Sequence, residues 1–432
     1  MKFRKFHLSF MILIFFGLAI QPAVAQSPQE LTLQDAEKLA VQNHPQIQAA
    51  TYLASAAQAR VTEAKSVYYP QAYGSLTGAY AETNSRIAAG GLNNPIVFDR
   101  YANGITISQF ITDFGRTHEL VKSSKLQAQA EQQNVVRTRA DVLLQVDQTY
   151  YGVLKAQAVL RVAEETVKAR QLVSEQITTL QKNKLKSGLD VSFANVDLAQ
   201  AQLLLIQAQN DLQASWADLS AALGLSEERT FVLTDPAAPE PPAQDFETVL
   251  QQALQNRPEL LGQRLETQSA QSYAAAERDL WLPTLSGVGT AGLIPYRVSS
   301  LSSRYAAAGF NMNVPIFNGH LFGALRSEAT SHAHAQEQYL RDIQNRITRD
   351  VRTAWLNANS GYQRLSVTNQ FVDQARQALE LAQARYKLGL SSIIELSQAQ
   401  LNETQAEIAD ASAKYDYENQ YSALNYQMGL LH

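Results

Sequence analysis

The apolar and polar positions change their spacing in a set order along the chain, and the order occurs twice. Residues 33–68 have helical spacing that ends before Pro70. Residues 71–111 alternate apolar side chains with small or polar ones on either side of a loop at 90–95 that is rich in Gly and Asn. The first pattern predicts a helix, and the second predicts two strands joined by a loop.

The two faces of the predicted strands differ in polarity. Tyr101, Ile105 and Ile107 alternate with small or polar residues, and Phe310 and Met312 do the same in the second half of the chain. A strand between lipid and a wet channel has this pattern, and so has an ordinary half-buried strand. Periodicity alone leaves both interpretations open.

Each predicted strand pair is followed by a helical stretch of unusual length, at residues 117–186 and 320–387. About 70 residues at 1.5 Å per residue give a helix of roughly 105 Å. Apolar residues recur every seven positions in both stretches, which is typical of coiled-coil packing. In the second stretch these residues are Val351, Ala358, Leu365, Val372, Leu379 and Tyr386. Each stretch is expected to end at a glycine, Gly188 or Gly389, from which a further helix returns.

These patterns indicate an internal repeat of about 205 residues. The matched landmarks are, in chain order, Pro45 with Pro258, Pro70 with Pro283, 111–113 with 316–318, 186–189 with 387–390, and 223–225 with 428–430. Their offsets are 213, 213, 205, 201 and 205 positions. We therefore expect a first structural repeat at 26–226, a Pro-rich connector at 227–245 and a second repeat at 246–432.

Residues 1–25 have the pattern of a secretory signal peptide. A basic start precedes an apolar run at 8–20, and a small-residue cleavage site ends at Ala25. The apolar run is short for a membrane-spanning helix, which needs about 20 residues, so an uncleaved anchor is the weaker interpretation. No later segment has 18 uninterrupted apolar residues. We therefore expect no transmembrane helix after Ala25.

Composition narrows the range of functions. The 432 residues contain no cysteine, which excludes disulfide scaffolds, thiolate metal sites, cysteine nucleophiles and a lipid anchor on cysteine. A net charge of −4 and a sequence pI of about 6.0 give no support for nucleic-acid binding. A mean hydropathy of −0.23 excludes a bundle of transmembrane helices. An exported chain of this kind is periplasmic, secreted or an outer-membrane β-barrel protein.

The duplicated order resembles the TolC family of outer-membrane factors over essentially the whole chain after residue 25. Asn43-His44-Pro45 and Asn256-Arg257-Pro258 open the two halves as they do in that family. The residues that resemble its strand-to-helix junctions are Pro70, Asp113, Gly115, Pro283, Pro315 and Asn318. Those that resemble its periplasmic tip turns are Gly188, Leu189, Gly389 and Leu390.

The resemblance implies a mainly α fold with a β-barrel portion. A homotrimer would take four strands from each protomer into a twelve-strand barrel in outer-membrane lipid, continued by a long periplasmic α-helical barrel. The resemblance also implies an exit duct for a tripartite efflux pump or type I secretion system, with a periplasmic adaptor at the tips and an inner-membrane transporter beyond it. Independently, four strands in lipid would leave open edges, so closure requires other copies of the chain.

The resemblance further implies an aperture gate at the second tip. Glu395 corresponds to an acidic position that lines the closed aperture, whereas Gln398 stands at a second position that is acidic in the best-known members. Tyr386 corresponds to a tyrosine that latches the inner coiled coil to its neighbour, and Ser391 stands where that family has an arginine latch partner. The candidate acceptors for Tyr386 on the first hairpin are Asn195 and Asp197.

No residue pattern indicates catalysis, a cofactor or a resident metal. His332 and His334 lie two positions apart and so point to different faces of a helix. The sequence contains no Gly-x-Ser-x-Gly elbow. The leading hypothesis is an outer-membrane conduit in a Gram-negative type of envelope. The alternatives are an exported coiled-coil scaffold or adhesin without a pore and, less favoured, an exported enzyme.

Overall fold

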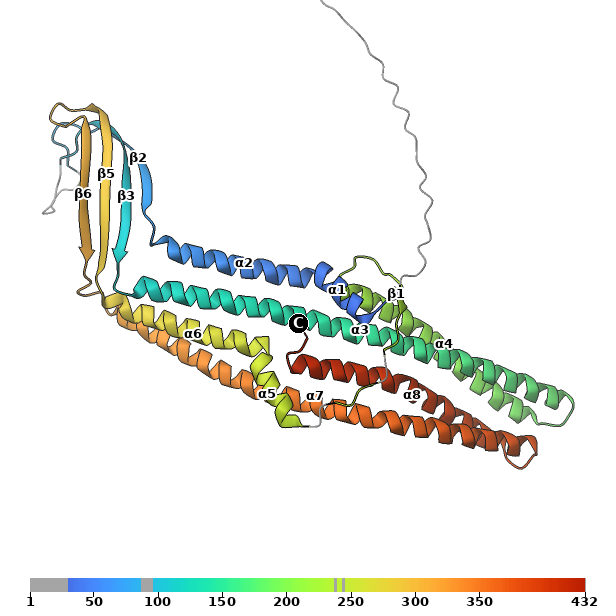
Figure 1. The fold of residues 1–432 in the computed structure, drawn as a ribbon. Coiled ribbons are helices and arrows are strands. Elements are labelled where there is room, and N and C mark those ends of the chain that lie inside the picture. The colour runs from blue at the N-terminus through green and yellow to red at the C-terminus, as the bar shows by residue number, and fades with distance from the viewer. Residues whose placement is uncertain (1–29, 87–95, 237–238, 243–244, 432) are drawn as a thin grey trace, which may run out of the picture.

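The chain forms a long rod with a four-stranded sheet at one end and two helical hairpin tips at the other (Figure 1). The computed structural model describes residues 30–86, 96–236, 239–242 and 245–431. The predicted signal segment and the predicted loop at 90–95 lie outside the described residues.

The expected order of elements is present twice. The first half contains β1 (Glu30–Leu31), α1 (Leu33–Asn43), α2 (Pro45–Ser66), β2 (Gln71–Ala79), β3 (Arg100–Thr112), α3 (Arg116–Lys182), α4 (Gly188–Ala222) and β4 (Val232–Leu233). The second half contains α5 (Phe246–Asn256), α6 (Pro258–Arg278), the 3₁₀ turn η1 (Asp279–Trp281), β5 (Thr284–Arg297), β6 (Arg304–Asn313), α7 (Leu321–Lys387) and α8 (Ile393–Gln427).

The helix expected at 33–68 is in fact two helices, which is a correction to the sequence-based prediction. The backbone of His44 is extended, and α2 begins at Pro45. Proline suits the first position of a helix, because the N–H that it lacks has no partner in the helix at that position. The same residue would break a helix that continued through it, so α1 has to end before it. His44 Nδ1 accepts a hydrogen bond from the Gln46 amide at 3.3 Å and so caps the new helix. The second half breaks in the same way at Arg257.

The sheet has the order β2-β3-β5-β6, and every neighbouring pair is antiparallel. The two repeats join in its middle, where Thr106 lies opposite Thr290 and their hydroxyls are 3.1 Å apart. The pairing register places Thr106 on a face of mainly small and polar residues, which also carries Tyr73, Phe110 and Val288, and places Ile105 on the opposite, mainly apolar face. Large side chains on the apolar face, such as Leu76 and Phe310, are exposed. An uncovered apolar face suits lipid and does not fit an ordinary half-buried strand.

The predicted long helices are confirmed. Helices α3 and α7 have 67 residues each, which corresponds to about 100 Å. In α7 the heptad positions from Val351 to Tyr386 are buried, except for Leu365, which is half-buried. Toward the tips α4 packs on α3, α3 on α8, and α8 on α7, whereas toward the sheet the order is α2, α3, α6 and α7. The two repeats therefore meet along α3 in both parts of the rod.

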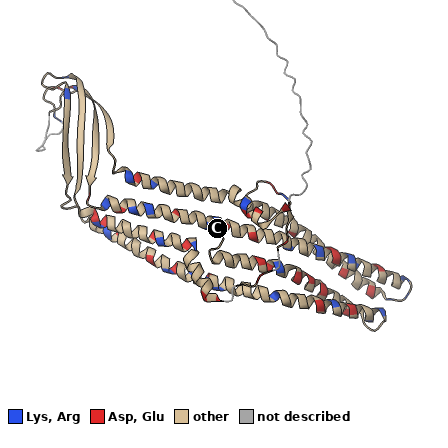
Figure 2. Cartoon of the chain, in the orientation of Figure 1, with Lys and Arg blue, Asp and Glu red and all other residues tan. Residues whose placement is uncertain are grey.

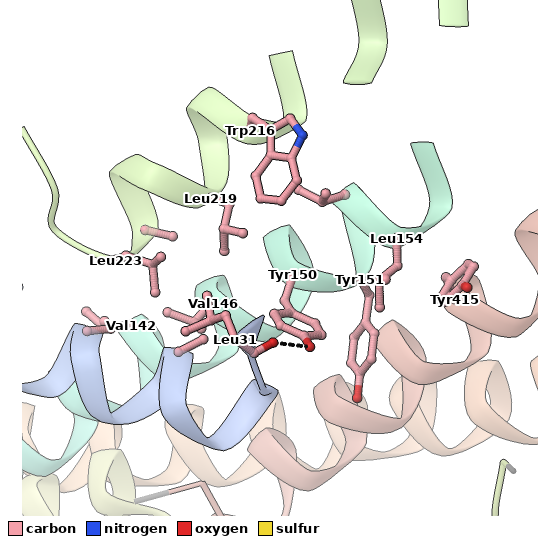
Figure 3. Close-up of a cluster of buried hydrophobic side chains, with 14 of the residues drawn as sticks. Leu31, Val142, Val146, Tyr150, Tyr151, Leu154, Trp216, Leu219, Leu223 and Tyr415 are labelled. Carbon is pink, nitrogen blue, oxygen red and sulfur yellow. Dashed lines mark hydrogen bonds between the residues drawn. The ribbon is translucent and has the colours of Figure 1, made fainter. Parts of the chain in front are cut away.

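The largest core cluster lies in the middle of the rod, where α1 and α4 cover α3 (Figure 3). Tyr150 is fully buried there, and its hydroxyl donates to the carbonyls of Leu31 at 2.9 Å and Thr234 at 2.8 Å. These bonds hold β1 and β4, which pair in parallel. The predicted non-helical connector at 227–245 thus contains a short strand anchored to the first repeat.

Candidate functional site

The second tip is a tight turn at the expected glycine. Gly389 follows the end of α7 with a φ of +72°, and the Leu390 amide donates to the Arg385 carbonyl at 2.8 Å. This bond satisfies one of the carbonyls that the end of a helix leaves free, and glycine allows the left-handed backbone at no steric cost. Ser392 then caps α8, because its hydroxyl accepts a hydrogen bond from the Glu395 amide at 3.4 Å.

The first tip has the same geometry, but its turn residue is Lys184 and not the expected Gly188. Lys184 has a φ of +60°, and the Leu185 amide donates to the Leu180 carbonyl at 2.9 Å. Gly188 is the first residue of α4, directly after the capping residue Ser187. The tips therefore correspond at an offset of 205, with Lys184 equivalent to Gly389, and the predicted offset of 201 is wrong by four positions.

Tyr386 forms a link between the two hairpins within one chain. It is buried, and its hydroxyl donates to Asp190 Oδ1 at 3.3 Å. Burial, together with the nearby Asp190 carboxylate, raises the pKa of Tyr386 to about 12, so the hydroxyl stays protonated. Partial burial favours the neutral acid at Asp190, but hydrogen bonds from Ser187 and Tyr386 outweigh it and lower the pKa. The Lys186 ammonium lies 3.5 Å from the centre of the Tyr386 ring.

The predicted acceptors for Tyr386 have other partners, which is a further correction. Asn195 Oδ1 accepts a hydrogen bond from Ser174 at 2.7 Å, so it joins α4 to α3 inside the first hairpin. Asp197 accepts from Ser397 at 2.5 Å and joins α4 to α8. Once the tips are matched at an offset of 205, Asp190 is the equivalent of Glu395, in the first turn of α4.

Glu395 and Gln398 lie on α8 just after the second tip, and both are exposed. The Glu395 carboxylate is 3.0 Å from Arg385 Nε, so one chain already balances part of its charge. Gln398 donates to Asn402 Oδ1 at 3.0 Å on the same helix. The side chain of Ser391 has a buried hydroxyl for which the described residues offer no hydrogen-bond partner.

The strand-to-helix junction of the first repeat is organised by Asp113. Its buried carboxylate accepts from the Thr117 amide at 2.8 Å, the Thr117 hydroxyl at 2.5 Å and the Gly115 amide at 3.3 Å. These bonds satisfy amides at the start of α3. Gly115 has a φ of +133°. The junction residues Pro70 and Pro283 directly precede β2 and β5.

The second junction, from Pro315 to Asn318, is built differently. Both side-chain polar atoms of Asn318 are buried and lack a hydrogen-bond partner among the described residues. Gly319 has a φ of +64° and His320 has a φ of +68°. In the first repeat the equivalent positions are Phe114, with a φ of +59°, and Gly115. Both repeats therefore have a positive φ at the same two positions, but the glycine stands second in the first repeat and first in the second.

Helix α4 carries an exposed apolar side. By length and composition it is the one helix of the described residues that could cross a membrane, which the sequence analysis did not anticipate. It packs on α3 along the rod and returns from the tip as half of a hairpin (Figure 1). Its exposed apolar residues are Leu189, Val196, Leu203 and Ile206. We interpret the part of this side beyond the tip, which carries Val196, Leu203 and Ile206, as a helix-packing surface, because Val196 and Leu203 are spaced by seven.

Acidic and imidazole groups do not gather into a metal site in the part of the chain that the structure describes, where no group of three or more could hold an ion. His332 and His334 are exposed on α7. The nearest carboxylates, those of Glu328 at 4.0 Å and Glu337 at 3.3 Å, belong to the same helix.

Three comparisons agree on what this chain is similar to. A family model described as outer membrane efflux protein matches residues 37–225 and 249–430. Outer membrane protein TolC of Vibrio cholerae serotype O1 is 27% identical over 397 residues, which cover 88% of this chain and 86% of that protein. TolC of Escherichia coli strain K12 is 22% identical over 94% of this chain and 83% of its own length. The solved Campylobacter jejuni CmeC outer membrane channel has the same fold, with a TM-score of 0.81 at 18% identity over 92% of this chain and 85% of that one.

Proposed function

The chain belongs to the outer membrane efflux protein family, and on this premise we propose that it is the exit duct of a tripartite efflux pump or type I secretion system. It would conduct substrates passively from the periplasmic assembly to the outside. The carrying observation is the sheet with an uncovered apolar face, continued by a helical rod of about 100 Å. A lipid-spanning part joined to a rod that reaches into the periplasm is what an exit duct requires.

The repeat supports closure of the duct by further copies of the chain. Within one chain, β3 pairs with β5, and α3 packs on α8. The repeat equivalents of these contacts are β6 with β2 and α7 with α4, which one chain cannot make because those elements lie at opposite edges. Neighbouring copies would make them in the same way around a ring. Three copies would give twelve strands with no open edge, as lipid demands.

We place the adaptor-docking end at the two tips. Gly389 and Leu390 form one turn, and Lys184 and Leu185 form its equivalent, whereas Gly188 and Leu189 begin the returning helix. These turns lie at the far end of the rod from the sheet (Figure 1). A periplasmic adaptor bound there would link the duct to an inner-membrane transporter.

The aperture gate belongs to the same end. Three copies of Glu395 around one axis would form a ring of carboxylates that attracts cations. Arg385 screens each carboxylate, and Gln398 supplies no second ring, so cation block should be weak. The bond between Tyr386 and Asp190 would hold the α7–α8 hairpin in its resting position against the first hairpin.

Single-channel recording of detergent-purified protein in planar bilayers tests this function. We expect discrete cation-selective openings that divalent ions block from the tip side, and a weaker block in Glu395→Ala. Unchanged selectivity and block in that variant would remove Glu395 from the aperture. Release of the protein from membranes by urea, with no conductance in bilayers, would instead indicate a scaffold without a pore.

A further inference from the structure

The charges at the two tips are unbalanced. Residues 180–192 and 384–396 together carry five basic side chains and two acidic ones. The basic residues are Lys182, Lys184, Lys186, Arg385 and Lys387, and the acidic ones are Asp190 and Glu395. Each chain thus presents an excess of three positive charges at this end of the rod. Figure 2 shows basic residues at the ends of both hairpins.

Only two of the five basic side chains have a partner within the tips. Arg385 pairs with Glu395, and Lys186 lies over the Tyr386 ring. The other three, Lys182, Lys184 and Lys387, are exposed, and no carboxylate of the described residues lies within ion-pair distance of them. They remain available to a partner.

Helix-end electrostatics explains two of these three lysines. Lys182 and Lys387 lie in the last turns of α3 and α7, where a positive charge stabilises the negative end of the helix dipole. Lys184 lies beyond the end of α3 in the left-handed conformation, where the other tip has Gly389. A side chain there strains the backbone relative to glycine. Local stability therefore favours glycine at position 184, and the lysine needs another reason.

Both tips also present the same pair of apolar side chains. Leu185 and Leu390 are equivalent at the 205 offset, and so are Leu189 and Ile394. Their exposed fractions are 68%, 67%, 64% and 60% in that order. Water exposure of four large apolar side chains at the end of a rod indicates a contact surface.

We infer that the tips bind a protein whose contact surface has apolar side chains flanked by Asp or Glu, and that Lys184 makes the main ionic contact of the first tip. This inference rests on the proposed docking of an adaptor at the tips. The apolar pairs would supply the contact shared by both tips. The lysines would supply charge complementarity, which favours the correct partner and speeds association.

Two crosslinking chemistries on the full-length chain in its host cells separate the two claims. A photoreactive amino acid at Leu185 captures whatever protein touches the tip, and mass spectrometry assigns the crosslinked peptide. A water-soluble carbodiimide joins a lysine amine to a carboxylate with no spacer, so it reports only pairs at ion-pair distance. We expect both reagents to join the tip to one periplasmic protein, with the carbodiimide linking Lys184 to Asp or Glu beside the photo-captured peptide.

Variants at position 184 isolate the charge from the fold. Lys184→Gly should fold at least as stably as the parent, because it relieves the left-handed backbone, yet should lower photo-capture about two- to fivefold, the range for one exposed ion pair. Lys184→Arg keeps the charge, so it should retain capture while losing the carbodiimide link. Lys168→Gln, which removes an exposed lysine farther up α3, should change neither readout.

The outcomes are distinct. Photo-capture of a periplasmic protein with no carbodiimide link from Lys182, Lys184 or Lys387, or with a captured surface that lacks acidic residues, would overturn the inference and leave adaptor docking intact. Equal capture by Lys184→Gly and the parent would also overturn it. If neither Leu185 nor Leu390 captures any periplasmic protein, the proposed docking end is itself wrong.

Discussion

The chain has an inner seam, where α3 meets α6 and α8, and two open edges, which α4 and α7 form. The seam and the edges are built from equivalent parts of the repeat, but their side chains differ. At the inner seam Tyr151 is buried, and Ala411 packs against the same core. Their equivalents 205 positions away, Leu356 and Ile206, are 50% and 63% exposed. Apolar residues thus occupy both sets of positions, but one chain covers only the first set. The difference is what the proposed closure by further copies requires of the edges.

The polar residues of the inner seam sharpen this contrast. Arg170 is buried and donates to the Gln400 carbonyl at 2.7 Å and to the Thr404 hydroxyl at 2.9 Å. Lys155 pairs with Asp416 at 2.7 Å. The repeat equivalents of Arg170 and Lys155 are Ala375 and Ser360. The inner seam therefore has two polar locks whose repeat equivalents on α7 carry no charge.

The largest expected effect comes from a charge on an open edge. Ile206→Glu would place three carboxylates in the apolar seams of the proposed trimer, where an unpaired buried charge costs several kcal/mol per copy. We expect sedimentation in detergent to show loss of the trimer. Leu172→Glu is the matched control, because Leu172 is 56% exposed but lies on the inner helix α3. Equal loss in both variants, or in neither, would contradict the assignment of α4 as an edge.

A smaller effect is expected from Asp147, a buried acid of the inner seam. Burial, and to a lesser extent the nearby Glu37, raises its pKa from an ordinary 3.8 to about 7. The folded state therefore holds a proton that the unfolded state releases, so stability should fall as pH rises from about 4 to 7 and level off above. Asp147→Asn should remove this slope and raise stability at pH 8 by roughly 2–4 kcal/mol. Thermal unfolding at several pH values measures both, and an unchanged slope would show that Asp147 titrates normally.

Arg170→Met tests the polar lock itself. The variant keeps an apolar stem but leaves the Gln400 carbonyl and the Thr404 hydroxyl without their charged donor, which should cost about 1–3 kcal/mol. We expect a lower unfolding temperature and more frequent spontaneous openings in bilayers. Arg170→Lys retains one donor and should be intermediate. A stable variant with unchanged openings would mean that the guanidinium does not hold the seam.

The smallest expected effect concerns the tip. Tyr386→Phe removes one hydrogen bond to Asp190 and keeps the packed ring, so the resting state should lose only about 1 kcal/mol, because the bond is long at 3.3 Å and only partly buried. Basal conductance should rise while trimer content stays constant. Asp190→Asn keeps a neutral acceptor, so it should give a smaller change in the same direction if the bond is the latch. No rise with Tyr386→Phe would show that the hydroxyl is not a latch, whereas a rise with both Tyr386→Phe and Asn195→Ala and none at Asp190 would return the role to the acceptor first expected from the sequence.

Much of the architecture could be predicted from the sequence because its signals are periodic. Heptads running from Val351 to Tyr386 and alternation around Ile105 each extend over many residues, so single exceptions do little harm. The break at His44 was missed, since helical spacing continues on both sides and Pro45 alone marks the boundary. The exposure of the apolar sides of α4 and α7 could not be predicted from periodicity, because it depends on which other helices pack against them.

The tip register was missed for a different reason. The dipeptides at Gly188 and Gly389 look alike, and a glycine was expected wherever the backbone turns. A better signal was present, because Ser187 and Ser392 each precede an acid by three residues, the pattern of a helix-capping box, and they lie 205 apart. With that register, the sequence would have predicted Asp190 as the acceptor of the Tyr386 hydroxyl.

The central claim, closure by further copies through the repeat, makes a specific prediction about strand pairing. Transferring the pair Thr106–Thr290 through the offsets of 205 and 213 places Asn311 of β6 opposite Thr77 of β2 in the next copy. Directly opposed residues of antiparallel strands are about 4.5–5.5 Å apart, within reach of a disulfide. The chain has no cysteine of its own, so any disulfide that forms must join the two engineered cysteines.

The most direct measurement is therefore oxidation of the double variant Thr77→Cys, Asn311→Cys, followed by denaturing electrophoresis. The account predicts covalent species up to a closed trimer, and no such species when Asn311→Cys is combined with Tyr73→Cys, which lies on the same face but four residues out of register. Absence of covalent oligomers from the first pair, or equal yields from both pairs, would contradict closure through the repeat.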